Sequence, residues 1–474
     1  MARPERMTRI GILLAVLTLL SACAGKQPLP DGLSYRGGEY GLSRAEFVSD
    51  MTYTDPSGER AFDQQIFDRA FRMIAGAQRF VLVDMFLYND FQGPRPEPHR
   101  QLARQMTEVL VARKKRSPGM RIVVITDPVN TMYGGVAPPY FQTLRDAGIE
   151  LYITDLTKLP DSNPSWSGFW RTFIEPLGNS TNGWIPTPFG DDPVTLRSYL
   201  SFLNFKANHR KIVITDKGNG LTALVTSGNP HDPSSAHSNI GAVIDGPAAW
   251  ELLQSENAAL ALNDAPPFKV KRPREPRNPN LSVQVITEGK IQDAVLTELR
   301  SLKAGDELDI AMFFISDRRM IAELKNAHDR GVAMRIVLDP NLTAFGFNRN
   351  GIPNVPVAAE LRAHGLNLRW CKPTGEQCHY KIMMARHRDG SRWMTLGSTN
   401  LTRRNLDDFN LETNLLFRGN GKAKLFGETD RWFEAVWTNK GGRQYTKTLA
   451  ENVPNTFDKI LIYRFMEGSG WAPF

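Results

Sequence analysis

Two stretches of the chain carry the same pair of reactive side chains. His209 and Lys211 begin one apolar run, and His379 and Lys381 begin another in the second half of the sequence. Residues two apart in a strand leave by the same face, so each run would present an imidazole beside an ammonium group. Such a pair suits the binding and cleavage of a phosphate ester.

An Asn belongs to each pair. Asn-Gly at 219–220 and Asp-Gly at 389–390 are hairpin signals, because these residues tolerate the positive φ that tight turns need. The first turn lies midway between His209 and Asn229, and the second lies midway between His379 and Asn400. Each hairpin therefore returns its Asn to the side of its own His and Lys, which builds one His, Lys and Asn cluster twice.

The two clusters predict a two-step reaction at phosphorus. One imidazole can add to the phosphorus atom and form a phosphoenzyme. The other, when protonated, can give its proton to the leaving oxygen and later accept one from water or an alcohol. The Lys and Asn side chains would hold the non-bridging oxygens. No His, Cys or Asp cluster has the spacing of a metal site, so we expect no metal and no cofactor.

The doubled pattern resembles that of the phospholipase D superfamily, whose signature is H-x-K-x4-D, then a Gly/Ser-rich turn and an Asn. The first copy fits at His209, Lys211 and Asp216, whereas the second holds Arg386 at the Asp position. The resemblance implies an α/β fold of two similar lobes, each a mostly parallel mixed sheet flanked by helices, with one active site between them. It also implies that His209 is the nucleophile and His379 the acid.

The two copies differ in their supporting residues. Glu412 matches a family carboxylate that orients an imidazole. Counting from the Asn of each cluster, Gly241 stands at the equivalent place in the first copy, and Asn239 corresponds to Asn410. Only one His then has an obvious carboxylate partner, which leaves the two roles open. Arg386 matters less to the chemistry, because about 3.3 Å per residue puts it roughly 16 Å from His379 along the strand.

The repeat extends beyond the signature. Helix and strand patterns recur in both halves, at 67–85 and 294–314, at 120–127 and 334–339, and at 141–153 and 357–370. Alternating helices and strands predict a largely parallel sheet in each lobe, with the signature hairpin added antiparallel. We expect a monomer with two pseudo-symmetric lobes.

Composition suggests how the chain divides. The first lobe is predicted at 45–263, a Pro- and Arg-rich linker at 264–280, the second lobe at 281–440 and a tail without an assigned role at 441–474. The first lobe alone has an insertion at about 156–203, with six aromatic side chains: Trp166, Phe169, Trp170, Phe173, Trp184 and Phe189. This insertion is either a lid or membrane-contacting segment or a piece whose aromatics pack onto the body.

The N-terminus has the pattern of an exported lipoprotein. Residues 1–22 contain three Arg and then an apolar run too short to span a membrane, which predicts a signal peptide. Leu20-Ser21-Ala22-Cys23 resembles a bacterial lipobox, so Cys23 is the expected lipidation site and 23–44 the tether. The protein would then be membrane-anchored and face the periplasm. In that oxidising compartment, Cys371 and Cys378 are predicted to form a disulfide.

These features predict a phospholipase D-type enzyme that cleaves or exchanges a glycerophospholipid phosphodiester through a phosphohistidine. The acceptor would be water, or an alcohol as in cardiolipin synthesis. The formal net charge of +8 favours anionic partners but does not distinguish phospholipid from nucleic acid. A nuclease ranks lower, because no run of basic and aromatic residues suited to stacking bases is present. A non-catalytic phospholipid-binding lipoprotein, with Arg386 marking a decayed site, is the third hypothesis.

Overall fold

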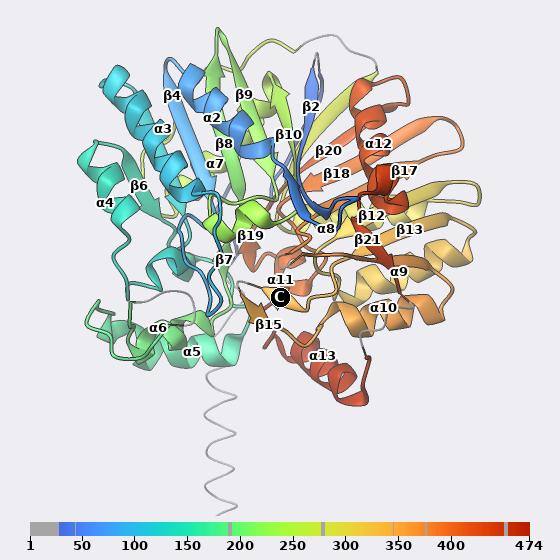
Figure 1. Cartoon of the computed structure of the whole chain (residues 1–474). Helices are drawn as coiled ribbons and strands as arrows, with labels where there is room; N and C mark the ends of the chain where they lie inside the picture. Colours follow the sequence, from blue (N-terminus) through green and yellow to red (C-terminus); the bar gives the residue numbers. More distant parts are fainter. Residues whose placement is uncertain are drawn as a thin grey trace, which may run out of the picture.

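The computed structural model describes residues 28–474, except 43, 188–191, 276–279, 345, 375–376 and 450–453. The predicted signal peptide (1–22), the lipidation site Cys23 and Phe189 lie outside the described residues. Two large mixed sheets lie side by side, each flanked by helices (Figure 1). The expected α/β class with two similar lobes is confirmed.

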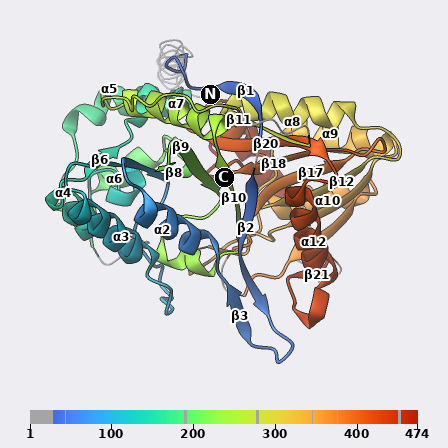
Figure 2. The same cartoon turned by 90° about the horizontal axis from the view of Figure 1, so that it is seen from above.

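The first lobe is built on eight strands. Their order is β3 (Arg60–Asp63), β2 (Ala45–Thr54), β10 (Asn239–Asp245), β9 (Gly220–Thr226), β8 (Lys211–Lys217), β4 (Phe80–Met85), β5 (Arg121–Thr126) and β6 (Glu150–Ile153). Helices α2 (Ile66–Gly76), α3 (Leu102–Arg116) and α4 (Pro139–Asp146) cover one face, and α7 (Pro247–Ala261) covers the other (Figure 2). Because both faces are covered, β4 and β5 are mostly apolar and are buried except at the first residue of β5, as expected for central strands.

The second lobe is built on nine strands. Their order is β1 (Arg36–Gly41), β11 (Leu281–Thr287), β20 (Thr413–Asn420), β18 (Ser391–Gly397), β17 (Lys381–Arg386), β12 (Glu307–Met312), β13 (Ala333–Leu338), β16 (Asn367–Cys371) and β21 (Thr446–Thr448). One face packs against α8 (Gly289–Ser301), α9 (Arg318–Asp329) and α10 (Asn354–Ala363), and the other against α12 (Lys424–Thr438). The predicted helix and strand repeats of the two lobes are therefore present.

Strand direction differs from the expectation of mostly parallel sheets. Within the two large sheets, parallel pairing is confined to β4, β5 and β6 in one lobe and to β12, β13 and β16 in the other. These strands are joined through helices, which a parallel connection requires. The other ladders of both sheets are antiparallel, because hairpins and the returning chain segments add their strands that way.

Two segments predicted to lie outside the lobes contribute strands to the second sheet. β1 comes from the predicted tether and pairs with β11, while β21 comes from the predicted tail and pairs with β16. The tail continues into α13 (Phe457–Ser469). Within the described part of the chain, no helix is long and apolar enough to cross a membrane.

The lobes share one hydrophobic core where their sheets meet. Side chains of β9 and β10, such as Val225 and Ile240, belong to the same buried cluster as Leu396 and Leu415 of β18 and β20. Each signature hairpin stands next to this contact, as β8–β9 in one lobe and β17–β18 in the other. The contact therefore fixes the two predicted half-sites relative to each other.

Candidate active site

Each predicted catalytic His is held by the backbone of the opposite lobe. The N–H of His209 donates to the carbonyl oxygen of Leu411 at 2.9 Å, and the N–H of His379 donates to that of Ser238 at 2.8 Å. The short strand β7 (Ala207–Asn208) before His209 pairs in parallel with β19 (Asn410–Leu411). The two histidines thus lie at the lobe interface, where each depends on the other lobe for its position.

Both histidines line one cavity of about 200 Å³. Asn229 and Asn400 line it as well, so the hairpins return both Asn residues to the site. The amide oxygen of Asn229 accepts from the N–H of Leu87 at 3.1 Å. The amide oxygen of Asn400 has no hydrogen-bond partner among the described residues.

Lys211 and Lys381 have matching environments beside this cavity. Each ammonium group donates to the carbonyl oxygen of its own His, at 2.6 Å for Lys211 and 3.3 Å for Lys381. Each also lies 5.1 Å from the centre of a phenylalanine ring, Phe86 or Phe313. The same two rings meet the imidazoles edge-on, with centroids 4.9 Å apart in both lobes.

Two buried aspartates support the half-sites from behind. Asp127 accepts from the N–H of Asn208 at 2.7 Å, and Asp339 accepts from the N–H of Cys378 at 2.8 Å. Burial raises the pKa of Asp127 to about 7 and that of Asp339 to about 6. Both aspartates end a strand of the predicted repeat, so the sequence showed that their positions match. It did not show that each accepts a backbone N–H close to a catalytic His.

The partners of the imidazoles are where the two half-sites differ. Nδ1 of His209 lies 2.9 and 3.1 Å from the carboxylate oxygens of Glu412, which is fully buried. Ser398 and Asn405 also donate to this carboxylate. Although burial alone would raise the pKa of Glu412, the neighbouring His209 and Lys211 lower it, so the carboxylate stays charged.

The other imidazole has neutral partners. Nδ1 of His379 lies 2.9 Å from the carbonyl oxygen of Ser227 and 3.2 Å from the amide oxygen of Asn239. The Ser227 hydroxyl accepts from the N–H of Ile240, just as the Ser398 hydroxyl accepts from that of Thr413. Asn239 is therefore the spatial counterpart of Glu412.

Counting along the sequence paired these positions wrongly. It matched Glu412 with Gly241 and Asn410 with Asn239 because it assumed segments of equal length. The second segment is longer and contains the short helix α11 (Arg403–Leu406). Asn410 is buried outside the cavity, and its side-chain amide has no hydrogen-bond partner in the described part of the chain.

Burial shifts the pKa values of the four basic groups downward. It lowers the pKa of His209 to about 4, although Glu412 opposes the shift, and that of Lys211 to about 7. The pKa values of His379 and Lys381 fall well below their usual ranges, because burial is reinforced by neighbouring cations. Both imidazoles are thus neutral at pH 7, with Nδ1 engaged and Nε2 left to face the cavity.

Asp216 and Arg386 lie outside this chemistry. Asp216 accepts from the backbone N–H groups of residues 78–80 at the far end of its strand. Arg386 forms ion pairs there with Glu307, Asp309 and Asp430. Neither lines the cavity, so the departure from the signature leaves the site intact.

Several cavity-lining residues were missed from the sequence. Arg404 and Arg349 add cationic side chains, and Phe474 brings the C-terminal tail to the site. The predicted disulfide between Cys371 and Cys378 is present, with Cα atoms 6.3 Å apart, and it precedes His379 directly. Of the two loop histidines after Asn229, His237 lies 5.6 Å from the His379 ring between centroids.

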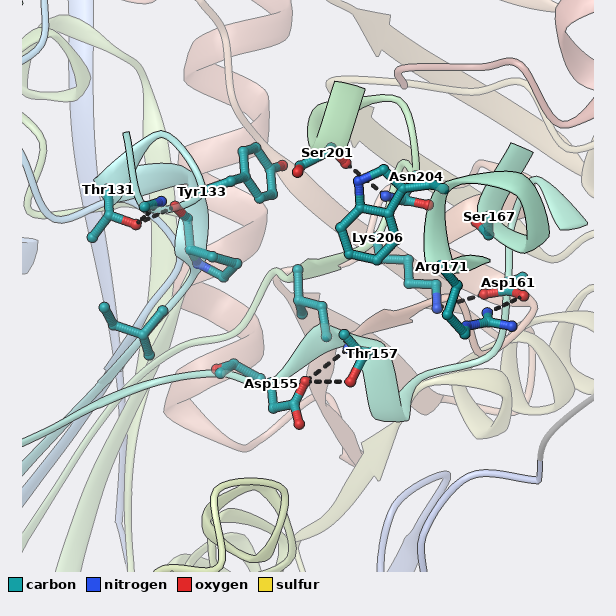
Figure 3. A pocket seen from close by; sticks show the side chains of 16 residues that line it. Thr131, Tyr133, Asp155, Thr157, Asp161, Ser167, Arg171, Ser201, Asn204 and Lys206 are labelled. Carbon is teal, nitrogen blue, oxygen red and sulfur yellow. Dashed lines mark hydrogen bonds and ion pairs between the residues drawn. The ribbon is translucent and has the colours of Figure 1, made fainter. Parts of the chain in front are cut away.

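A second cavity of about 370 Å³ (Figure 3) is lined in part by direct sequence neighbours of residues that line the first. Met132 and Phe202 face the catalytic cavity, whereas the adjacent Tyr133 and Ser201 line the second one. Its cations are paired, since Arg171 and Lys206 both lie 2.6 Å from Asp161. None of the predicted catalytic residues lines it, so the smaller cavity is the candidate active site.

Comparison with protein-family models matches residues 281–437 to the cardiolipin synthase, PLD-like domain. Among solved structures, the chain is similar to a phosphatidylserine synthase from Haemophilus influenzae Rd KW20, with a TM-score of 0.57 and 9% sequence identity. The similarity covers 92% of this chain and 96% of that one.

Two other solved structures resemble the chain more weakly. A polyphosphate kinase from Porphyromonas gingivalis has a TM-score of 0.44 and 13% sequence identity, and the similarity covers 90% of this chain and 53% of that one. The phospholipase D family member Nuc from Salmonella typhimurium has a TM-score of 0.26 and 22% sequence identity, and the similarity covers 33% of this chain and 95% of that one. Comparison with curated protein sequences gave no match. The second lobe thus matches a PLD-like domain, and the chain as a whole shares the fold of the phosphatidylserine synthase.

Proposed function

We propose that the protein cleaves or exchanges the phosphodiester of a glycerophospholipid through a phosphohistidine intermediate. The observation that carries the proposal is the pair of half-sites whose His and Asn residues line one cavity, each with a buried Lys beside its His, and with a carboxylate on only one of the two imidazoles. Paired imidazoles over a cationic pocket can supply both a nucleophile and an acid. The coarser assignment, to phosphodiester chemistry, agrees with the domain that the second lobe matches.

His209 is the better nucleophile of the two. Its Nδ1–H donates to Glu412, which holds the Nε2 lone pair toward the cavity and stabilises the positive charge that develops when Nε2 bonds to phosphorus. The bond from phosphorus to the leaving alkoxide oxygen breaks in the same step. Asn229 and Asn400 line the cavity in which the negative charge of the transition state would develop, and Lys211 and Lys381 lie behind the cavity-lining rings of Phe86 and Phe313, where their charge would stabilise it.

His379 is the proton donor in this scheme. Its low pKa in the free protein means that it must take up a proton as the anionic phosphodiester binds, since a nearby negative charge favours the imidazolium form. It passes this proton from Nε2 to the leaving oxygen. In the second step it removes a proton from water or an alcohol, whose oxygen attacks phosphorus and releases His209.

The names of similar proteins support a phospholipid substrate. The matched domain is described as that of a cardiolipin synthase, and the structure with the same two-lobed fold is a phosphatidylserine synthase. Both names favour transfer of a phosphatidyl group to an alcohol acceptor. The phenylalanines that line the cavity, including Phe86 and Phe313, suit a substrate with apolar parts.

The direct test is incubation of the protein with phosphatidylglycerol and phosphatidylethanolamine vesicles, with and without a chelator and with glycerol as an added acceptor. We expect chelator-resistant turnover of at least one lipid, and none from a His209→Ala variant. Failure to turn over either lipid, or turnover abolished by the chelator, would contradict the proposal. If the protein cleaved DNA but neither lipid, and the His209→Ala variant lost this cleavage, the site would be that of a nuclease.

We also propose that the protein is exported and anchored by a lipid on Cys23. The lipobox-like Leu20-Ser21-Ala22-Cys23 sequence supports this localisation. Mass spectrometry of the protein isolated from membranes should find a mature N-terminus that starts at Cys23 and carries acyl chains. An unmodified Cys23 would contradict the anchor without affecting the proposed reaction.

A further inference from the structure

Exposed apolar side chains gather in two segments of the chain. Of the twelve large apolar residues that are exposed in the described structure, eleven lie within 169–202 or 457–471, and Phe62 is the twelfth. The first segment contributes Phe169, Phe173, Leu177, Trp184, Leu196 and Phe202, and the second contributes Phe457, Leu461, Ile462, Phe465 and Trp471. Single exposed apolar residues are ordinary, but a concentration of this kind marks a contact surface.

The helix α5 (Pro164–Phe173), in the first segment, has its polar side turned inward. Its buried residues are Ser167 and Gly168, and Arg171 reaches inward to Asp161 at 2.6 Å (Figure 3). Its phenylalanines face outward, with Phe173 57% exposed. A helix that packs onto a soluble protein normally buries its apolar stripe. In α5 the phenylalanines are exposed instead, and small and polar residues are buried.

The helix α13, in the second segment, is reversed in the same way. Tyr463 and Glu467 are its buried residues, and the Tyr463 hydroxyl donates to the carbonyl oxygen of Ser316 at 2.7 Å. Phe457 and Phe465 are 73% and 66% exposed. Both helices thus make polar contacts with the body and present apolar side chains to the outside, although Tyr463 and Met466 of α13 also pack on the core of the second lobe.

The two segments come from opposite lobes, and Trp471 of the second lies next to two aromatic rings that flank the first. The ring of Trp471 lies 6.1 Å from that of Trp166 and 6.3 Å from that of Phe205 between centroids. Figure 1 shows α5, α6 (Leu196–Phe202) and α13 along the same lower edge of the molecule. Phe202 from the first segment and Phe474, which follows the second, also line the catalytic cavity. The apolar surface is therefore continuous with the wall of the active site.

We propose that this surface, formed by α5, α6 and α13, inserts into the outer layer of a lipid bilayer and presents the cavity to the phospholipids there. The proposal rests on the proposed function, which makes a phospholipid the substrate. Trp and Phe are the side chains that favour the boundary between head groups and acyl chains. Arg404 and Arg349, which line the cavity reached from this surface, suit the lipid phosphates.

Fluorescence quenching by brominated lipids tests the insertion directly. The wild-type chain and a His209→Ala variant should both show tryptophan quenching on vesicles of brominated phosphatidylglycerol, because docking precedes the chemistry. Trp184, which is 71% exposed, should account for a large share, so Trp184→Phe should lower the quenching. Absence of quenching in the wild-type chain would overturn the proposal.

Paired substitutions locate the surface. F169S/F173S and F457S/F465S should each raise the lipid concentration for half-maximal binding at least tenfold, and should lower vesicle turnover relative to turnover of bis(4-nitrophenyl) phosphate. Phe62→Ser is the matched control, since Phe62 is 47% exposed in β3, outside both segments, and should change neither value. Every variant keeps the same N-terminus, so a lipid anchor contributes equally to all of them.

The outcomes separate this inference from the proposed function. Quenching without turnover of any lipid would sink the proposed reaction and leave the docking surface standing. Turnover of vesicle lipid that neither double variant reduces would overturn the docking surface alone. Conversion of a wild-type dimer into monomers by the double variants, without quenching, would assign the surface to contact between copies of this chain and would likewise overturn the proposal.

Discussion

The half-sites of the two lobes agree closely in their framework and differ in one partner. Each has a His clamped by the opposite lobe, a Lys over a phenylalanine ring and an Asp that accepts a backbone N–H. The imidazole of His209, however, meets the carboxylate of Glu412, while that of His379 meets a carbonyl and the amide of Asn239. A repeated framework thus carries two different electrostatic environments, and the difference assigns the roles of nucleophile and acid.

Removing the charge of Glu412 should have the largest effect. Glu412→Gln keeps the shape but lets the amide favour the wrong tautomer of His209, so kcat should fall about a thousandfold. The matched change in the other half-site, Asn239→Ala, removes a neutral partner and should cost only about tenfold. Steady-state kinetics on one lipid compare the two. Equal losses would mean that the carboxylate does not distinguish the half-sites.

Replacing either buried lysine by methionine should lower activity and raise stability. Lys211→Met should lower kcat by at least about a hundredfold, because a cation that faces the transition state is lost. It should also raise the free energy of unfolding by roughly 1 to 3 kcal/mol, since burying this ammonium group is costly. Thermal and denaturant unfolding measure the gain, and Lys381→Met should behave alike. A destabilised Lys211→Met protein would contradict the desolvated site.

The pH dependence of stability provides a separate check on Lys211. Its pKa of about 7 in the folded protein lies below the unfolded value, so the unfolded chain binds more protons between those two values. Stability contributed by this group therefore rises with pH from about 7 toward about 10. In Lys211→Met this part of the rise should disappear, and an unchanged slope would contradict the lowered pKa.

Adding a carboxylate to the second half-site should sharpen the comparison. Asn239→Asp would place a negative charge beside His379 and favour its imidazolium form. The alkaline limb of the profile of kcat/KM against pH should then move up by at least about one pH unit, with a change in kcat of about tenfold or less. An alkaline limb that stays in place would show that His379 is not the acid that this limb reports.

The far ends of the signature strands should matter least to activity. Asp216→Ala removes the acceptor of three backbone N–H groups and should cost about 2 kcal/mol of stability. Arg386→Ala should cost about 1 kcal/mol or less, because Arg335 still pairs with Asp309 at 2.8 Å. Activity of both variants should stay within about threefold of wild type once corrected for the folded fraction. A larger loss in Arg386→Ala would revive the idea of a decayed second site.

Much of the fold and the centre of the site could be predicted from the sequence. The hairpin turns at Asn219-Gly220 and Asp389-Gly390 placed Asn229 and Asn400 correctly, because turn chemistry is local. Strand direction was less accessible, since pairing between β2 and β10 or between β1 and β11 depends on contacts between distant segments.

The partners of the imidazoles were harder to predict, because they cross from one lobe to the other. Glu412 contacts His209 and not His379, although His379 is closer to it along the sequence. Only the assembled interface between the lobes shows this contact. The insertion of α11 shifted the register between the half-sites, so counting paired Glu412 with Gly241 instead of Asn239. The tail gave no chemical signal at all, yet Phe474 reaches the cavity.

The measurement that tests the central claim most directly is the position of the phosphorylated residue. The protein would be quenched during turnover of a phosphodiester with a good leaving group, and its peptides mapped under conditions that preserve phosphohistidine. We predict phosphate on Nε2 of His209 in the wild-type protein, accumulation of the same species in His379→Gln, and none in His209→Gln. Phosphate on His379 in the wild-type protein would reverse the assigned roles and contradict the account.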